Sequence, residues 1–144
     1  MASAAVLYTP DVLALATSLA AFRFDEDLQL QADARSRSCG STLRLGLALD
    51  ETGRVARVGL RSQACAIGQA SAAIFAQASV GRTAQEINAT AEAIARWLAG
   101  EEEQPDWPGL TTIAAARDFP GRHGALMLPW TAAVQALAGR SADS

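Results

Sequence analysis

Two cysteines are the residues of this sequence whose types and surroundings favour chemistry. Cys39 stands in Ser-Cys-Gly-Ser, where Gly40 allows a tight turn that leaves the thiol accessible. Cys65 opens an Ala-rich run of helical periodicity, and a thiol at a helix N-terminus lies near unpaired amides and the positive end of the helix dipole. These positions favour thiolates that bind a metal or attack an electrophile. The alternative is two buried structural thiols, since free cysteine also packs as a small apolar side chain.

The segments between the two cysteines predict that they meet. Apolar and other residues alternate over 43–49, turn residues follow at 50–53, and residues 55–60 read as the return strand. A hairpin of this kind brings a strand start and a helix start to one end of a sheet. A further alternation over 28–33 adds a third strand. The predicted fold class is α+β, a three-stranded antiparallel sheet with helices packed on one face.

The helices are predicted from apolar periodicity and end signals. They are residues 10–20, a run from Cys65 closed by Gly81, a helix from a Thr83–Glu86 capping box to Gly100, a short helix capped by Asp106, and a last helix from about residue 128 to Gly139. Trp97, Trp107 and Trp130 fall at helical positions and are expected to be packing residues, the alternative being a partner-docking patch.

Length and composition narrow the class of protein. The chain has 144 residues, of which 50% are hydrophobic and 19% charged, as expected for one globular domain over 1–144 with a frayed tail at 139–144. The net charge of −3 gives no excess of cations to neutralise phosphates, which argues against nucleic acid as a partner. Every basic side chain is arginine, so lysine Schiff-base chemistry is excluded.

The apolar stretch 12–22 is expected to be a packed helix. Asp11 precedes it and the first arginine, Arg23, follows it, whereas a secretory signal carries its positive charge before the apolar run. The stretch is also too short to cross a bilayer, which takes about 20 apolar residues. We therefore expect a cytoplasmic protein with no membrane partner, whose cysteines are reduced thiols.

The motifs around both cysteines resemble the iron-sulfur cluster assembly scaffold family of IscU, SufU and the NifU N-terminal domain. Residues 39–41, 64–71 and 80–83 are similar, in order and spacing, to the family's Cys-Gly-Asp, Gly-Cys-Ala-Ile-Ser-x-Ala-Ser and Gly-Lys-Thr segments. Residues 7–9 are similar to the family's opening helix, and residues 119–130 resemble the SufU-like segment around its third cysteine. The resemblance covers nearly the whole chain.

This resemblance implies a non-enzymatic scaffold. A transient cluster, of the 2Fe–2S type, would be assembled on Cys39 and Cys65 with sulfur from a cysteine desulfurase and passed to iron-sulfur acceptor proteins. Such clusters normally take four cysteine ligands. One chain offers two thiolates, so the resemblance implies a homodimer on cluster binding, or help from His123, Ser41 or an exogenous thiol.

The sequence also departs from the family pattern. Ser41 replaces the family's aspartate, and a neutral hydroxyl is a poorer metal ligand than a carboxylate. The family's third cysteine falls on Ala125, and the His-Cys pair of the IscU branch falls on Gly124 and Ala125, so His123 is one residue out of register. SufU-like relatives bind zinc through three cysteines and the aspartate, hence zinc is expected here only weakly or not at all.

Several alternatives stay open for these residues. His123 becomes a third ligand if a mobile loop beside Gly121 and Gly124 swings it inward, or else it is an exposed loop histidine without a role. Asp118 is a further ligand candidate. The alternative function is that of a degenerate scaffold relative, which binds the cysteine desulfurase machinery as an interaction or regulatory module without assembling clusters. The missing aspartate and third cysteine support this alternative. A thiol enzyme using Cys65 with His123 as base matches the residue types, but their spacing fixes no geometry.

Overall fold

The computed structural model of the chain describes residues 7–37 and 40–142. The order of elements confirms the predicted succession of helix, strands and helices. The elements are α2 (Pro10–Ser18), η1 (Leu19–Ala21), β1 (Leu30–Arg35), β2 (Thr42–Leu49), β3 (Val55–Gln63), α3 (Ala66–Ser79), α4 (Ala84–Leu98), η2 (Leu110–Asp118), η3 (Pro120–Arg122) and α5 (His123–Ala142).

The three strands form an antiparallel sheet in the order β1-β2-β3. Leu45, at the centre of β2, lies opposite Ala32 of β1 and Leu60 of β3. The alternation that predicted β2 holds, because Leu43, Leu45 and Leu47 are all buried. The predicted fold class, α+β with a three-stranded antiparallel sheet, is confirmed.

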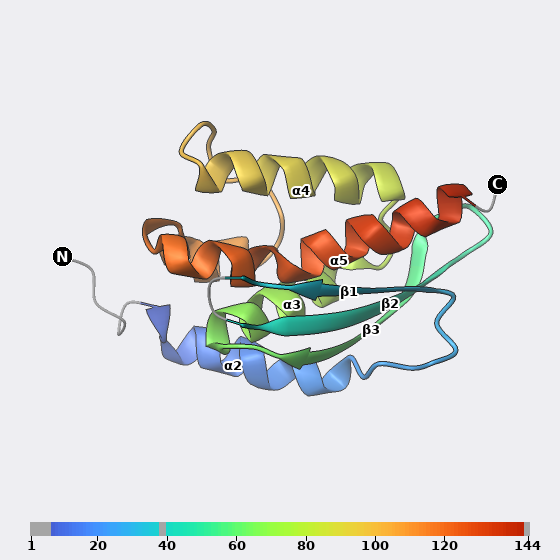
Figure 1. Cartoon of the computed structure of the whole chain (residues 1–144), viewed down its shortest axis with the longest axis horizontal. Coiled ribbons are helices and arrows are strands. Elements are labelled where there is room, and N and C mark those ends of the chain that lie inside the picture. The colour runs from blue at the N-terminus through green and yellow to red at the C-terminus, as the bar shows by residue number, and fades with distance from the viewer. Residues whose placement is uncertain (1–6, 38–39, 143–144) are drawn as a thin grey trace.

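Helices pack on one face of this sheet in two layers (Figure 1). α5 contacts β1 and β2, and α3 contacts β3. α2 lies against α3, and α4 lies on the outer side of α5 (Figure 1). No helix in the described part of the chain is long and apolar enough to cross a membrane.

The segment between η1 and β1 crosses part of the opposite sheet face. A Cβ on Gly46 would lie 2.6 Å from Cδ1 of Leu28, and one on Gly59 would lie 2.4 Å from the carbonyl oxygen of Arg23. Glycine is therefore required at both positions for the close approach. The predicted strand over 28–33 starts later than expected, at Leu30, because Leu28 folds over these two glycines.

An aromatic cluster fills the core between the helices. Phe75 stacks on Trp107 with 5.9 Å between ring centroids and meets Trp130 edge-on at 5.0 Å. The indole N–H of Trp107 donates to the carbonyl of Ile74 at 3.0 Å. The expectation that Trp97, Trp107 and Trp130 are packing residues agrees with their burial, but Trp107 lies in the irregular chain before η2 and not at a helical position.

Two predicted helix starts were wrong. The short helix after residue 106 is capped by Gly109, in the left-handed conformation with φ 88°, and not by Asp106, and it winds as a 3-10 helix. α5 begins at His123 and not near residue 128, so Pro129 lies inside it. Proline there removes the N–H that would bond to the carbonyl of Ala125, and its ring crowds that carbonyl. The preceding turn is held by the Ser71 hydroxyl, which donates to the carbonyl of Leu126.

Candidate functional site

Cys65 is the N-cap residue of α3, as its sequence position predicts. Its backbone is extended, with φ −65° and ψ 169°, and its carbonyl accepts the N–H of Gln69 at 3.0 Å. The Cys65 side chain is partly buried and makes no capping hydrogen bond with any residue that the structure describes. The positive end of the α3 dipole thus lies beside the Cys65 side chain.

Ser41 joins the loop before β2 to the start of α3. Its side chain is buried, with 4% of the residue exposed, and its Oγ accepts the N–H of Cys65 at 3.3 Å. Its carbonyl accepts the N–H of Ser36 at 2.8 Å, and Gly40 donates to the Ser36 carbonyl at 3.0 Å. Gly40 has φ 71°, the left-handed turn conformation that the sequence suggested. These bonds fix the described part of the β1–β2 loop against the N-terminus of α3.

Cys39 itself lies outside the described residues. Its neighbours Gly40 and Ser41 are described, and the pairing of Thr42 with Gln63 places the start of β2 beside the end of β3, which leads to Cys65. The predicted meeting of strand start and helix start is thus seen for Ser41 and Cys65. The pairing of Cys39 with Cys65 stays a prediction.

Position 125 lies beside the first turn of α3. Ala125 is fully buried in α5, and a Cβ added to Gly68 would lie 3.6 Å from the Cβ of Ala125. The position where the resemblance puts the family's third cysteine therefore faces the same helix end as Cys65. Its methyl group offers no donor atom.

His123 is the first residue of α5 and is partly buried, so it lies in a helix and not in a loop as expected. Its Nε2 lies 2.7 Å from the carbonyl oxygen of Arg117. A carbonyl only accepts hydrogen bonds, so Nε2 must carry a proton in this contact. Nδ1 is then the only nitrogen left to act as a ligand or base. Asp118 is exposed at the end of η2.

These donors do not form a closed metal site within the described residues. Across residues 7–37 and 40–142, no group of three or more His, Cys, Asp or Glu side chains is placed to hold a metal ion. A structural zinc site usually closes with four protein ligands. The described residues alone therefore do not supply the ligands of such a site.

The sequence did not predict the contact between Ser41 and the Cys65 amide. Sequence reasoning treated Ser41 only as a weak ligand in place of an aspartate. The bond joins residues 24 apart in the chain, beyond the local backbone contacts that serine hydroxyls commonly make, so no local signal indicated this role. Ser41 therefore aligns the two cysteine-bearing segments.

Comparison with known protein families identifies one family that matches most of the chain. The family described as the NifU-like N terminal domain matches residues 21–123. Among curated protein sequences, none matches this chain. The sequence match thus spans the sheet, the helices α3 and α4 and the start of α5.

Solved structures extend the similarity to almost the whole chain. A nitrogen-fixing NifU-like protein (N-terminal) from Brucella abortus has 24% identity and a TM-score of 0.89, over 98% of this chain and 99% of that one. A protein described as an iron-sulfur cluster assembly scaffold for the SUF system, from Fervidobacterium islandicum AW-1, has 23% identity and a TM-score of 0.80, over 94% and 99%. At these identities the likeness shows the fold.

Proposed function

This chain belongs to the NifU-like N terminal domain family, and we propose that it is an iron-sulfur cluster assembly scaffold that receives iron and sulfide on Cys39 and Cys65. The observation that carries the proposal is the 3.3 Å hydrogen bond from the Cys65 amide to Ser41 Oγ. This bond holds the residue two places after Cys39 against the residue that opens α3. A structure of the SUF-system scaffold from Fervidobacterium islandicum AW-1 shares the fold.

The N-terminus of α3 supports thiolate chemistry at Cys65. The positive end of the α3 dipole lies beside Cys65, and iron is bound by the thiolate form of cysteine. The thiol is partly buried, so it is sheltered from bulk solvent while remaining reachable. The cluster is cargo in this proposal, and the protein's part is to hold it until transfer.

Two thiolates per chain set the stoichiometry. A 2Fe–2S cluster normally takes four cysteine ligands, so two chains that each contribute Cys39 and Cys65 would complete the set. We propose that a cysteine desulfurase supplies the sulfur and that iron-sulfur acceptor proteins in the cytoplasm take the cluster. Within one chain His123 and Ser41 are weaker supplementary ligands, because each already makes a hydrogen bond.

Anaerobic reconstitution with iron and sulfide tests the proposal. The wild-type chain is expected to take up iron and sulfide, to show thiolate-to-iron absorption bands and to become dimeric on a sizing column. Cys39→Ala and Cys65→Ala should each abolish these changes. Thr83→Ala, which alters the N-cap of α4 and no thiol, is the matched control. Iron uptake that survives Cys39→Ala would show that the site is a different one.

Restoring the family's ligands gives a second test of the same site. The double variant Ser41→Asp, Ala125→Cys should hold iron or zinc within a single chain, because both positions lie beside the first turn of α3. Ala125→Cys adds one sulfur atom next to Gly68, which has no side chain to obstruct it. Metal content is measured by elemental analysis of monomeric protein. Unchanged metal retention in a folded double variant would count against this location.

One observation favours a second function, an interaction or regulatory module that binds the desulfurase without assembling clusters. Ala125 is fully buried and supplies no donor, and Ser41 already accepts the Cys65 amide. This alternative predicts capture of the chain by an immobilised cysteine desulfurase together with no iron, zinc or sulfide by elemental analysis after anaerobic reconstitution. Metal uptake that depends on both cysteines would exclude it.

A further inference from the structure

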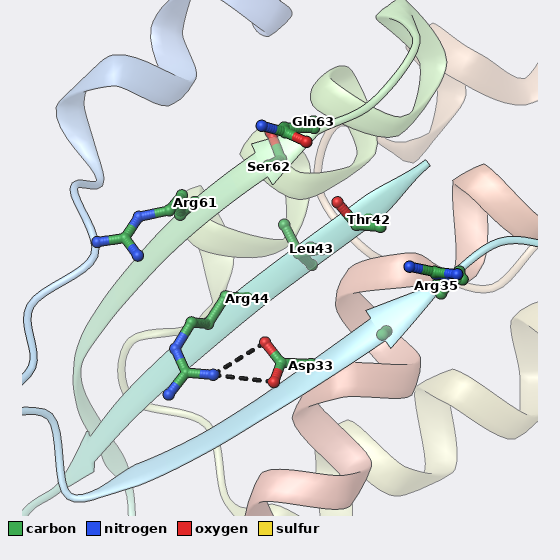
Figure 2. Close-up of a pocket in the computed structure, with 9 residues that line it drawn as sticks. Asp33, Arg35, Thr42, Leu43, Arg44, Arg61, Ser62 and Gln63 are labelled. Carbon is green, nitrogen blue, oxygen red and sulfur yellow. Dashed lines mark hydrogen bonds and ion pairs between the residues drawn. The ribbon is translucent and has the colours of Figure 1, made fainter. Parts of the chain in front are cut away.

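The sheet face opposite the helices carries a hollow lined by arginines from all three strands (Figure 2). We call this surface the arginine face and define it by six residues. They are Asp33 and Arg35 of β1, Thr42 and Arg44 of β2, and Arg61 and Gln63 of β3. The face adjoins the part of the sheet that is covered at Gly46 and Gly59.

Strand register arranges these six side chains in two rows across the sheet. Asp33, Arg44 and Arg61 lie directly opposite one another in the first row, and Arg35, Thr42 and Gln63 do so in the second. Arg44 and Arg61 are therefore a cross-strand pair of like charges. Such a pair destabilises a sheet relative to a neutral pair.

The charges on the arginine face are not balanced within the described chain. Arg44 pairs with Asp33 at 2.8 Å and donates to Gln31 at 2.9 Å. Neither Arg35 nor Arg61 has a carboxylate partner among residues 7–37 and 40–142. The face therefore presents uncompensated positive charge on a chain whose net charge is −3.

Phe24 positions two of the arginines without neutralising them. The guanidinium carbons of Arg44 and Arg61 lie 5.2 Å and 5.0 Å from the centroid of its ring. Cation–π contacts of this kind stabilise the side chains by about 0.5–1 kcal/mol each at exposed sites. They also hold the donor groups in fixed positions at the surface. The arrangement is preorganised for an anion.

The second row of the face leads directly to the candidate site. Thr42 follows Ser41 in the chain, and its partner Gln63 is two residues before Cys65. A molecule bound along the arginine face would therefore reach the end of the sheet where the cysteine-bearing segments begin. The positive charge of the arginine face therefore lies where it can hold a partner next to the candidate site.

We propose that the arginine face docks a carboxylate-rich segment of a partner protein. Guanidinium groups bind carboxylates in paired, planar hydrogen bonds, and three adjacent strands at about 4.8 Å spacing offer such groups over the length of a peptide segment. Nucleic acid fits less well, because Asp33 lies within the face and the whole chain is acidic. The proposal needs no bound cluster and stands apart from the proposed function.

Fluorescence anisotropy with the iron-free full chain tests this docking. The probe is a fluorescein-labelled peptide of alternating Glu and Ser, about ten residues long, which is enough to cross the three strands in extended form. The wild-type chain should bind it with an affinity that falls as salt rises. Arg35→Gln with Arg61→Gln should weaken binding at least about tenfold, since both unpaired guanidiniums are lost.

The matched control is Arg54→Gln with Arg96→Gln, which removes the same charge from two arginines outside the arginine face. Its affinity should stay within about twofold of wild type, as screening of surface charge predicts. Arg35→Glu alone should weaken binding further than Arg35→Gln alone, and circular dichroism verifies the fold of each variant. Equal loss in both double variants, no binding by wild type, or tighter binding of a single-stranded oligonucleotide of the same length would each overturn the proposal.

Discussion

The helices α3 and α4 begin in opposite ways. At α4, Thr83 accepts the N–H of Glu86 at 3.1 Å, and Glu86 accepts the N–H of Thr83 at 3.4 Å, so a full capping box closes the helix. At α3, Cys65 occupies the N-cap and its thiol closes no hydrogen bond with a described residue. The α4 terminus is completed by its own side chains, whereas among the described residues the Cys65 side chain supplies no such cap to α3.

The bodies of the two helices explain how the chain tolerates this difference. Ten of the 14 residues of α3 are buried, whereas only four of the 15 residues of α4 are. α3 is thus held by packing along its whole length and needs little from its first turn. α4 rests on one apolar stripe, so its cap contributes a larger share of its stability. Burial along its length therefore allows α3 to begin without a side-chain cap from Cys65.

Removal of a large side chain from the body of α3 should give the largest effect. Phe75 is fully buried between Trp107 and Trp130, and Phe75→Ala should lower the free energy of unfolding by about 3–5 kcal/mol. Chemical denaturation measures this loss. Gln77→Ala, on the exposed side of α3, is the control and should change stability by less than about 0.5 kcal/mol. A small effect of Phe75→Ala would break the claim that packing holds α3.

Loss of the α4 cap should have a smaller but clear effect. Thr83→Ala removes the acceptor for the Glu86 amide and should lower the free energy of unfolding by about 1 kcal/mol. Thr83→Ser keeps that acceptor and should stay close to wild type. Equal stability of the Ala and Ser variants would mean that α4, like α3, depends on packing alone.

The helix termini also show which parts of the fold could be predicted from sequence. The Thr83–Glu86 capping box and the alternation of β2 are local patterns whose partners lie within a few residues, and both are found as predicted. Helix starts that depend on tertiary contacts were not predicted. α5 continues N-terminal of Pro129 because its first turns are buried against α3, and burial outweighs the local signal of a proline.

The candidate site likewise has features that local sequence predicted and features that depend on tertiary contacts. The position of Cys65 at a helix start followed from local periodicity. The bond between Ser41 and the Cys65 amide joins residues that are distant in sequence, and no spacing in the sequence specifies it. The engagement of His123 with the Arg117 carbonyl also depends on how α5 begins. Residue types therefore indicated the site, and only tertiary structure gave the roles of its neighbours.

Exchange of the Cys65 thiol for a hydroxyl tests the difference between the starts of α3 and α4. Serine is a preferred N-cap residue, so Cys65→Ser should raise the free energy of unfolding by about 0.5 kcal/mol while abolishing iron uptake. Denaturation and anaerobic reconstitution measure the two effects on one variant. Cys65→Ala is the control, which should lose iron uptake without a gain in stability. A fall in stability for Cys65→Ser would mean that the thiol already contributes to the fold.

The smallest expected effect concerns the turn that supports the closed terminus of α4. The Thr52 hydroxyl and the Arg54 amide donate to Asp50 and hold the pKa of this carboxyl below its ordinary value. Arg54 in turn pairs with Glu86 of the capping box at 3.5 Å. The charge of Asp50 therefore aligns a residue that contacts the α4 cap.

Because the pKa of Asp50 is lowered on folding, its contribution to stability is complete above the ordinary aspartate value of about 3.9 and is lost as pH falls through the lowered pKa. Wild type should exceed Asp50→Asn in denaturation midpoint at neutral pH, and the gap should close at acid pH. Glu51→Gln removes a neighbouring exposed charge and should show a small gap at both pH values. A gap for Asp50→Asn that does not change with pH would assign the turn's stability to side-chain shape and not to charge, and the support it gives to the α4 cap would then be independent of ionisation.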